Sequence, residues 1–309
     1  MDALLAPLTR HERTADYAAK VIVRWASLTV AVALAGVAAF LGVQGWPAVT
    51  AHTGLPLEAA NLWQLAVPLA FGSLWAGLLG LAMAAPVAIG VALFITWYAP
   101  TRLAKLLAAI IDLLAAVPSV VYGLWGLMVL APMMAGAYAW LGEHLGWLPL
   151  FSGRASATGR TIFTAALVLA IMVMPIMAAI CREVFQRTPE TNIEAAIGLG
   201  ATKWEVIRLT VFPFARSGII AGAMLGLGRA LGETMATAMV VSPVPFLISF
   251  SWISSANPNT VAAFIAQNFP EAHGMEVSAL IALGLVLFAI TFVVNALARR
   301  IARGDGERT

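Results

Sequence analysis

Charged residues are scarce in this sequence. Asp, Glu, Lys and Arg account for 11% of its 309 residues, whereas 61% are hydrophobic. Because a soluble domain carries about 25% charged residues, this composition argues against a soluble enzyme and predicts a polytopic membrane protein. We therefore expect the net charge of +3 to report membrane topology, since Lys and Arg collect in cytoplasmic loops.

Several residues and motifs that carry chemistry are missing as well. Cys181 is the only cysteine, so the chain can form neither an internal disulfide nor a cysteine metal cluster. The four histidines are scattered without the spacing of metal ligands, and no short basic cluster predicts binding to nucleic acid. The phosphate-binding loop Gly-x4-Gly-Lys-Ser/Thr is absent, so we expect no ATP hydrolysis by this chain alone.

Apolar runs long enough to cross a lipid bilayer, roughly 20 residues each, are abundant instead. They predict an all-α membrane protein with six transmembrane helices, at about 25–43, 67–98, 106–130, 161–181, 217–241 and 277–298. The intervening loops include 131–160 and 242–277, the latter with a re-entrant segment as the alternative. Asp112, inside the third span, is expected to bond Lys105 or the adjacent loop.

The distribution of positive charge predicts the orientation of these spans. One side of the membrane receives 15 of the 18 Lys and Arg residues, which makes that side and both termini cytoplasmic. The expected division is a cytoplasmic tail at 1–20, a first helix with a periplasmic loop at 21–66, a transmembrane domain at 67–298 and a C-terminal tail at 299–309. The transmembrane domain contains a polar loop at 182–216.

Two opposite charges lie in the fifth predicted span, and they are its only charges. Arg229 and Glu233 are four residues apart, which in an unbroken helix places them on one face, one turn apart. A charge at membrane depth costs about 2.5–3.5 kcal/mol on insertion scales, so such residues usually face a protein interior or a polar pathway. The pair is either part of a transport pathway or a structural salt bridge that locks helix packing.

Small residues repeat along the same span. Gly218, Gly222 and Gly226 are spaced by four residues, and Gly228 and Gly232 form a second such pair. Small residues at this spacing let two helices approach closely. The pattern therefore predicts a tightly packed neighbour for this helix.

The polar loop before this span has an interpretable pattern. Thr191 or Asn192 is suited to cap a short helix, Gly198 and Gly200 are suited to end it, and a second short helix is expected from residue 203. A pair of short helices at the membrane surface suits the docking of a partner protein. The alternative is an ordinary amphipathic loop without a partner.

At this point the residues resemble a known family. Glu194-Ala195-Ala196-x-x-x-Gly200 is similar to the EAA motif of bacterial ABC-importer permeases, the inner-membrane components of binding-protein-dependent transport systems. In that family the motif forms the coupling helix that enters a cleft of the ATPase subunit. The family pattern ends in Ile-x-Leu-Pro, whereas the sequence here is Thr-Val-Phe-Pro, so only Pro213 is retained.

Two further motifs narrow the resemblance. The segment 228–235, Gly-Arg-Ala-Leu-Gly-Glu-Thr-Met, resembles the signature of the phosphate-specific, PstC-type permeases, and Pro-Ser-Val-Val-Tyr-Gly-Leu at 118–124 resembles their third span. The resemblance covers roughly 72–300. It implies the type I fold of ABC-importer permeases and inorganic phosphate as substrate. Sulfate and molybdate permeases, which share Ala-Leu-Gly-Glu but continue differently, remain the alternative.

The resemblance also implies partners and roles. This chain would form half of a translocation pathway with a second, PstA-type permease, an ATPase dimer that holds ATP and Mg, and a periplasmic phosphate-binding protein. Arg229, Glu233 and Thr234 would act on the anion, because a planar guanidinium can make two parallel bonds to an oxyanion. Glu233 would accept a hydrogen bond from the proton that phosphate carries near neutral pH. An ion-coupled carrier that uses Glu233 as its proton site is the competing class.

Overall fold

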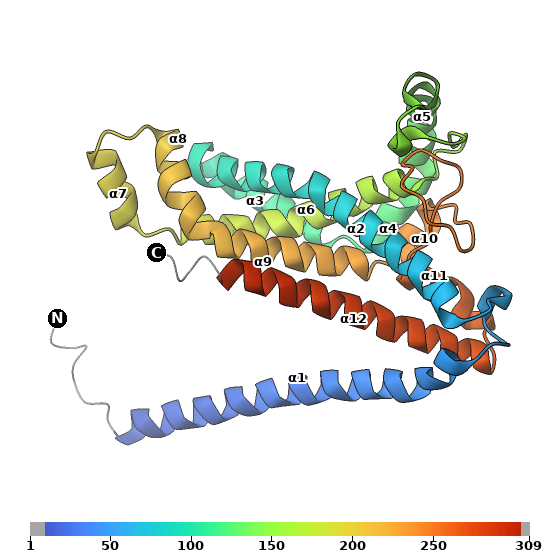
Figure 1. Ribbon diagram of the computed structural model, residues 1–309. Helices are drawn as coiled ribbons and strands as arrows, with labels where there is room; N and C mark the ends of the chain where they lie inside the picture. The colour runs from blue at the N-terminus through green and yellow to red at the C-terminus, as the bar shows by residue number, and fades with distance from the viewer. Residues whose placement is uncertain (1–9, 304–309) are drawn as a thin grey trace.

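The computed structural model describes the backbone of residues 10–303, and within that range the chain is all-α apart from two isolated β-bridges. Six stretches of helix are long and apolar enough to cross a membrane. Figure 1 shows most helices running side by side. The helices are α1 (Arg10–Thr50), α2 (Leu62–Leu93), α3 (Thr101–Ala116), α4 (Ser119–Trp125), α5 (Ala131–Leu145), α6 (Ile162–Gln186), α7 (Glu190–Gly198), α8 (Lys203–Val206), α9 (Phe212–Leu231), α10 (Met235–Val240), α11 (Val261–Asn268) and α12 (Met275–Arg303).

Four of the six predicted spans coincide with single helices. The spans predicted at 25–43, 161–181 and 277–298 lie within α1, α6 and α12, and the span at 67–98 is α2 with the π-turn that follows it. Hydroxyl and amide side chains begin two of these helices: Asn61 accepts a hydrogen bond from the Gln64 N–H at 3.0 Å, and Thr161 accepts one from the Thr164 N–H at 3.1 Å. Such caps satisfy N–H groups that lack a partner within the helix.

The third predicted span is broken, and the prediction of one helix over 106–130 is wrong. Helix α3 ends at Ala116, Val117 is extended, and α4 starts after Pro118. Proline has no N–H and disfavours helical geometry in the residue before it, so the helix stops there. The Tyr122 hydroxyl bridges the break by donating a hydrogen bond to the Leu114 carbonyl oxygen at 2.9 Å.

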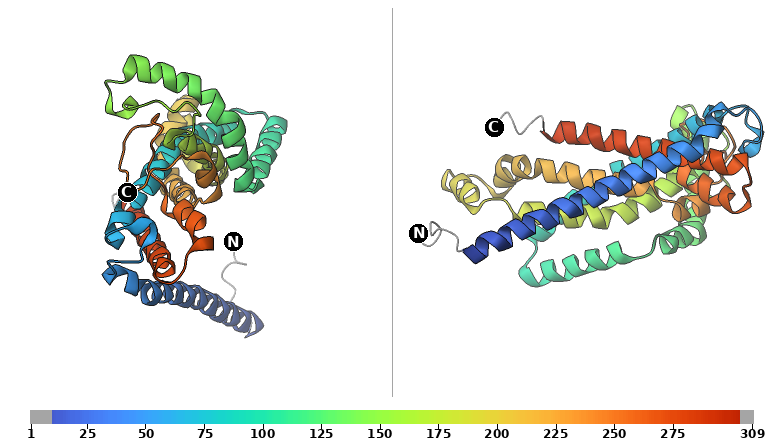
Figure 2. Two further views of the ribbon diagram at one scale, coloured as in Figure 1. Left: turned by 90° about the vertical axis from the view of Figure 1, so that its right-hand side faces the viewer. Right: turned by 90° about the horizontal axis from the view of Figure 1, so that it is seen from below.

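The region predicted as a loop at 131–160 also contains a helix. After α4 the chain continues through a π-turn at Gly126–Leu130 into α5, so that 119–145 is unbroken helix. Figures 1 and 2 show α5 turned across the end of the bundle, whereas α3 runs along it. The sequence of α5 mixes apolar residues with small and polar ones.

The fifth predicted span is interrupted as well. Helix α9 ends at Leu231, and α10 starts at Met235. The expectation of one helix from 217 to 241 is therefore wrong. The Thr237 hydroxyl donates to the Glu233 carbonyl oxygen at 2.9 Å and to that of Thr234 at 3.1 Å, which supplies a partner for the backbone freed by the break.

Helix α6 is the most deeply buried of the six candidate spans. Helices α2 and α9 pack along it, and its apolar side chains form the centre of the core, including Val168, Leu169 and Val173. The bundle is therefore organised around α6.

The glycine stripe of α9 faces α6, as its spacing predicts. A Cβ atom built on Gly218, Gly222 or Gly226 would lie 2.4, 3.2 or 2.5 Å from side-chain atoms of α6. Around Gly228, in contrast, a built Cβ atom meets nothing within 4 Å. The second glycine pair therefore does not serve packing, which corrects that expectation.

Helix α1 touches the rest of the bundle along part of its length. A Cβ atom on Gly45 would lie 2.8 Å from the Cα atom of Ala282 in α12, so the two helices meet closely there. Farther toward its start α1 leaves the bundle, and Figure 1 shows its first residues at the same end as α7, α8 and the last turn of α12. This arrangement places both ends of the described chain on one side.

We predict that the Gly226→Ala variant is less stable by about 1–3 kcal/mol, because the new methyl group would overpack the contact with Val173. Gly228→Ala is the matched control, and it should be neutral or stabilising, since alanine favours helix by about 1 kcal/mol over glycine. Thermal unfolding of both proteins in detergent measures the difference. Equal melting temperatures for the two variants would contradict the packing role of the stripe.

Candidate functional site: a basic groove beside two broken helices

The first candidate site is the exposed pair of short helices, α7 and α8, at the end of the bundle where α1 begins and α12 ends. Helix α7 closes with Gly200 at φ +85°, the left-handed region that favours glycine. The Ala201 N–H bonds the Ala196 carbonyl oxygen at 3.1 Å, and the Gly200 N–H bonds that of Ile197 at 2.9 Å. These two bonds define a Schellman motif. It leaves Leu199 89% exposed at the tip.

The predicted EAA-type residues all lie on this element. Glu194, Ala195 and Gly200 are exposed and Ala196 is half-buried. The helix begins at Glu190 after Pro189, without a side-chain cap, so the expectation that Thr191 or Asn192 caps it is wrong. Proline is well suited to the start of a helix because its missing N–H would be unpaired there.

Helix α8 connects this surface to the bundle. It begins as predicted at Lys203, with a capping box in which Thr202 and Glu205 bond each other's backbone N–H groups. Helix then runs without interruption from Lys203 through a π-turn to Leu231 at the end of α9. Pro213 lies near the start of α9, within this unbroken stretch.

Aromatic side chains support that junction from the side. The Phe212 ring packs against those of Phe185 and Trp204, with centroids 6.2 and 6.4 Å away. The Lys203 ammonium lies 4.8 Å from the centre of the Tyr98 ring at the end of the second span. Helix α8 thus contacts the second span through Lys203 and α9 through Trp204, and α9 in turn packs on α6 through Phe212.

The second candidate site surrounds Arg229. Arg229 is exposed near the end of α9, whereas Glu233 is 8% exposed and lies beyond the helix break. The structure contains no ion pair between these two described residues, which corrects the expectation of a salt bridge. Glu233 Oε1 instead accepts a hydrogen bond at 3.1 Å from the Ala236 N–H in the first turn of α10. Thr234 Oγ1 donates to the Gly232 carbonyl oxygen at 3.3 Å.

The two helix breaks meet beside Arg229. A Cβ atom on Gly123 of α4 would lie 2.8 Å from the Cα atom of Ala236 in α10, so these segments touch just after their breaks. Non-helical backbone at membrane depth is tolerated where it is buried in protein or lines a cavity, and in transporters it often marks a substrate site.

Arg229 lines a groove of ≈ 650 Å³ between α6, α9 and α12. The groove holds a second cation, Arg299, and the side chains of Ser217 and Asn295, but no carboxylate. Guanidinium and amide N–H groups donate hydrogen bonds, which suits an oxyanion. Sequence reasoning missed Arg299 and Asn295 because their position beside α9 follows from tertiary packing.

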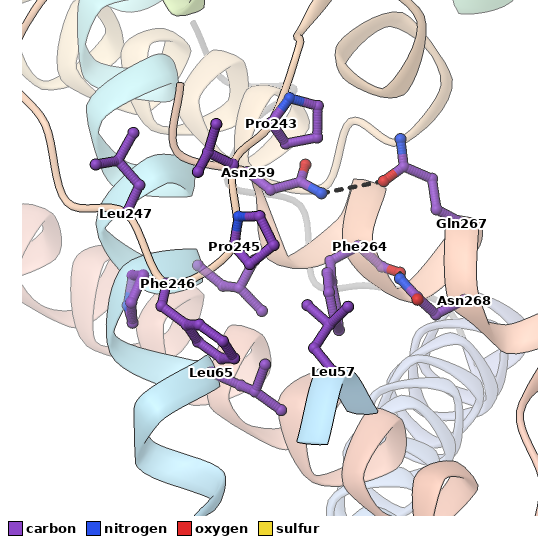
Figure 3. Close-up of a pocket in the computed structure, with 13 residues that line it drawn as sticks. Leu57, Leu65, Pro243, Pro245, Phe246, Leu247, Asn259, Phe264, Gln267 and Asn268 are labelled. Atoms are coloured by element: carbon purple, nitrogen blue, oxygen red, sulfur yellow. Dashed lines mark hydrogen bonds between the residues drawn. The ribbon is translucent and has the colours of Figure 1, made fainter. Parts of the chain in front are cut away.

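The opposite end of the bundle is closed by polar contacts. The Arg160 guanidinium donates to the Val241 carbonyl oxygen at 3.1 Å, and the buried Asn257 accepts from the Ile162 N–H at 2.9 Å. A pocket of ≈ 180 Å³ lies nearby, lined by 13 residues, none of them charged. Figure 3 shows Asn259 bonded to Gln267 at its rim, a contact of 3.0 Å. This pocket therefore has no cationic side chain in its lining that could bind an anion.

Asp112 has a partner other than the expected Lys105. Its carboxylate lies 3.6 Å from the guanidinium of Arg182 near the end of α6. The pair ties α3 to α6 through two residues that are 70 positions apart in the sequence. Asp112 therefore has a structural role away from the groove.

These features define a membrane transport subunit: a bundle with broken central helices, a basic groove and an exposed docking element. The chain belongs to the family of binding-protein-dependent transport system inner membrane components, which it matches over residues 86–304. It is 42% identical to "Phosphate transport system permease protein PstC 2" of Mycobacterium tuberculosis, in an alignment 313 positions long that covers 98% of this chain and 96% of the relative. It is 51% identical over 72% of its length to the PstC permease of Mycobacterium leprae, of which it covers 70%.

Solved structures confirm the ABC-importer permease fold. A chain of the inward-facing MetNI methionine ABC transporter aligns with 79% of this chain and 94% of its own length, at a TM-score of 0.53 and 17% identity. A bacterial ABC transporter involved in alginate import gives a TM-score of 0.53 at 15% identity, over 76% of this chain and 79% of its own. The protein is thus a multi-pass membrane protein with the predicted fold.

We predict that Gly200→Val weakens docking of the ATPase, because a β-branched residue at positive φ would break the Schellman motif. The strain is on the order of 1–2 kcal/mol. Gly200→Asn is the control, since asparagine tolerates this conformation. Co-purification of the ATPase with each variant measures docking. If the Gly200→Asn variant also lost the ATPase, then any side chain added at this position would prevent docking, and the conformation of the turn would not be the cause.

We also predict that the Glu233→Gln variant keeps most of the transport rate. The side-chain amide oxygen of the new glutamine can still accept the hydrogen bond from the Ala236 N–H. Glu233→Ala should lower stability by about 0.5–2 kcal/mol, the usual effect of removing a cap. Uptake and thermal unfolding are compared for the two variants. A glutamine variant that is fully stable but inactive would assign the carboxylate's charge to transport.

Proposed function

We propose that this chain is the transmembrane permease subunit of an ATP-driven importer of inorganic phosphate and forms half of its translocation pathway. The observation that carries the proposal is the similarity to a phosphate transport permease over 98% of this chain. The basic groove supports it, because Arg229 presents a guanidinium and no lining carboxylate opposes an anion. Sulfate or molybdate is the competing substrate class.

The same proposal includes the partners. A second, PstA-type permease would complete the pathway, an ATPase dimer would bind ATP and Mg and seat on α7 and α8, and a periplasmic phosphate-binding protein would deliver the anion. The exposed α7 tip with Leu199 and the continuous helix from α8 into α9 support ATPase coupling at Glu194, Ala195, Ala196 and Gly200. In this arrangement both termini are cytoplasmic, and the protein lies in the bacterial cytoplasmic (inner) membrane.

Coupling then follows from the geometry. Closure of the ATPase dimer would move α7 and α8, and the unbroken helix would carry that movement to the end of α9, where Arg229 lies. The break at Gly232 lets α9 move while α10 remains packed on α4. Arg229 would thereby change its access from one side of the membrane to the other.

Uptake of radiolabelled phosphate by the complete complex in proteoliposomes tests the proposal. We expect uptake to require ATP, to persist when a protonophore collapses the proton gradient, and to be competed poorly by sulfate and molybdate. Uptake that follows the proton gradient without ATP would support the ion-coupled carrier instead. Transport of sulfate or molybdate in preference to phosphate would change the substrate class.

Arg229 variants test the groove. Arg229→Lys keeps the charge but loses the planar fork, and we expect uptake to fall by roughly tenfold, the effect of about one charge-assisted hydrogen bond. Arg229→Gln should abolish uptake. Membrane abundance is measured alongside, and normal uptake by the glutamine variant at normal abundance would remove Arg229 from the pathway.

A further inference from the structure

The groove that contains Arg229 has a second cationic end. Helix α9 runs from the α8 junction toward Arg229, and α12 packs beside it and ends on the side of α7 and α8 (Figure 1). Ser217 and Arg229, both in the lining, are 12 residues apart in α9, which spans about 18 Å. Arg299 and Asn295 line the groove from the last turns of α12. Arg299 therefore lies toward the proposed cytoplasmic end.

We propose that Arg299 and Asn295 form a second oxyanion-binding point, which receives phosphate after it leaves Arg229. The inference rests on the proposed phosphate transport. Conduction through a pathway requires sites that bind an ion and also release it, and a second cation near the exit lowers the barrier for leaving the first. The groove wall between Arg229 and Arg299 includes Ala221, which has a small side chain, and Gly228, which has none, and these residues leave room for an anion.

The chemistry of this end suits a phosphate group. Arg299 offers a guanidinium fork, and the half-buried Asn295 one helical turn earlier offers an amide N–H₂ group. The lining includes no Asp or Glu that would repel an anion or neutralise the guanidinium. The remaining wall is largely apolar, with Ile176, Ile220 and Met224, so an anion would find its polar contacts at the two ends.

The neighbouring Arg300 provides a matched control. It carries the same charge at the same depth of α12 and lines a different groove, of ≈ 500 Å³, between α1 and α12. Arg299 and Asn295 border both grooves, whereas Arg300 borders only the second. If the arginines at this helix end served only to orient the chain in the membrane, replacing either would have the same effect.

The test measures phosphate uptake and ATP hydrolysis stimulated by the binding protein, using the complete complex in proteoliposomes. We expect Arg299→Gln to slow uptake by on the order of tenfold, as loss of a charge-assisted hydrogen bond predicts. ATP hydrolysis should change little, and Arg300→Gln should transport like the unaltered protein. Arg299→Lys should retain an intermediate rate. Equal uptake by Arg299→Gln and Arg300→Gln would overturn the inference.

Two further arms separate the alternatives. A net-anionic lipid headgroup bound at Arg299 would give an effect of Arg299→Gln in membranes with phosphatidylglycerol and none in pure zwitterionic phosphatidylcholine, whereas a site for free phosphate gives the same effect in both. If Arg299→Gln does not accumulate in the membrane, Asn295→Leu, which removes the amide at similar volume, replaces it, and unchanged uptake would then refute the site. Failure of the unaltered complex to transport phosphate would refute the proposed function itself.

Discussion

The close contact of α9 with α6 is the constraint on which the rest of this structure depends. A Cβ atom at Gly218 or Gly226 would clash with Val184 or Val173, and one at Gly222 would lie 3.2 Å from Ile180, so α9 approaches α6 closely through its glycine face. In a membrane, where apolar burial does not drive helices together, such tight packing is a main source of association. With α9 packed in this way, Arg229 lines the groove. The same contact positions the continuous helix that begins at α8.

Two helix breaks interrupt this rigid packing, between α3 and α4 and between α9 and α10. The chain breaks before α4 and before α10, and the two segments touch at Gly123 and Ala236. Each break is stabilised by its own hydrogen bonds, from Tyr122 in one case and from Glu233 and Thr237 in the other. The rigid part of the molecule thus ends where the charged groove begins, which is the arrangement that alternating access requires of a permease.

Glu233 illustrates how tertiary context changes the meaning of a residue. Its spacing from Arg229 indicated an ion pair, yet its carboxylate caps α10 because α9 has already ended at Leu231. A buried ion pair contributes little net stability once its desolvation is counted, whereas an N–H group in the first turn of a helix needs an acceptor. The glutamate thus holds the start of α10, while Arg229 lines the groove.

The sequence by itself determined the class of the protein: its apolar runs, its Lys and Arg asymmetry and its EAA-type motif predicted six membrane spans, a docking loop and the importer family. Hydrophobic length and glycine spacing are local properties, and they were read correctly for α1, α2, α6, α12 and the stripe of α9. The tertiary structure alone decided where helices break and which charges meet, since Pro118 and Gly232 are tolerated within a helix in some surroundings and end it in others. It also placed Arg299 in the same groove as Arg229 and Asp112 beside Arg182, because contacts between residues far apart in sequence depend on how helices pack.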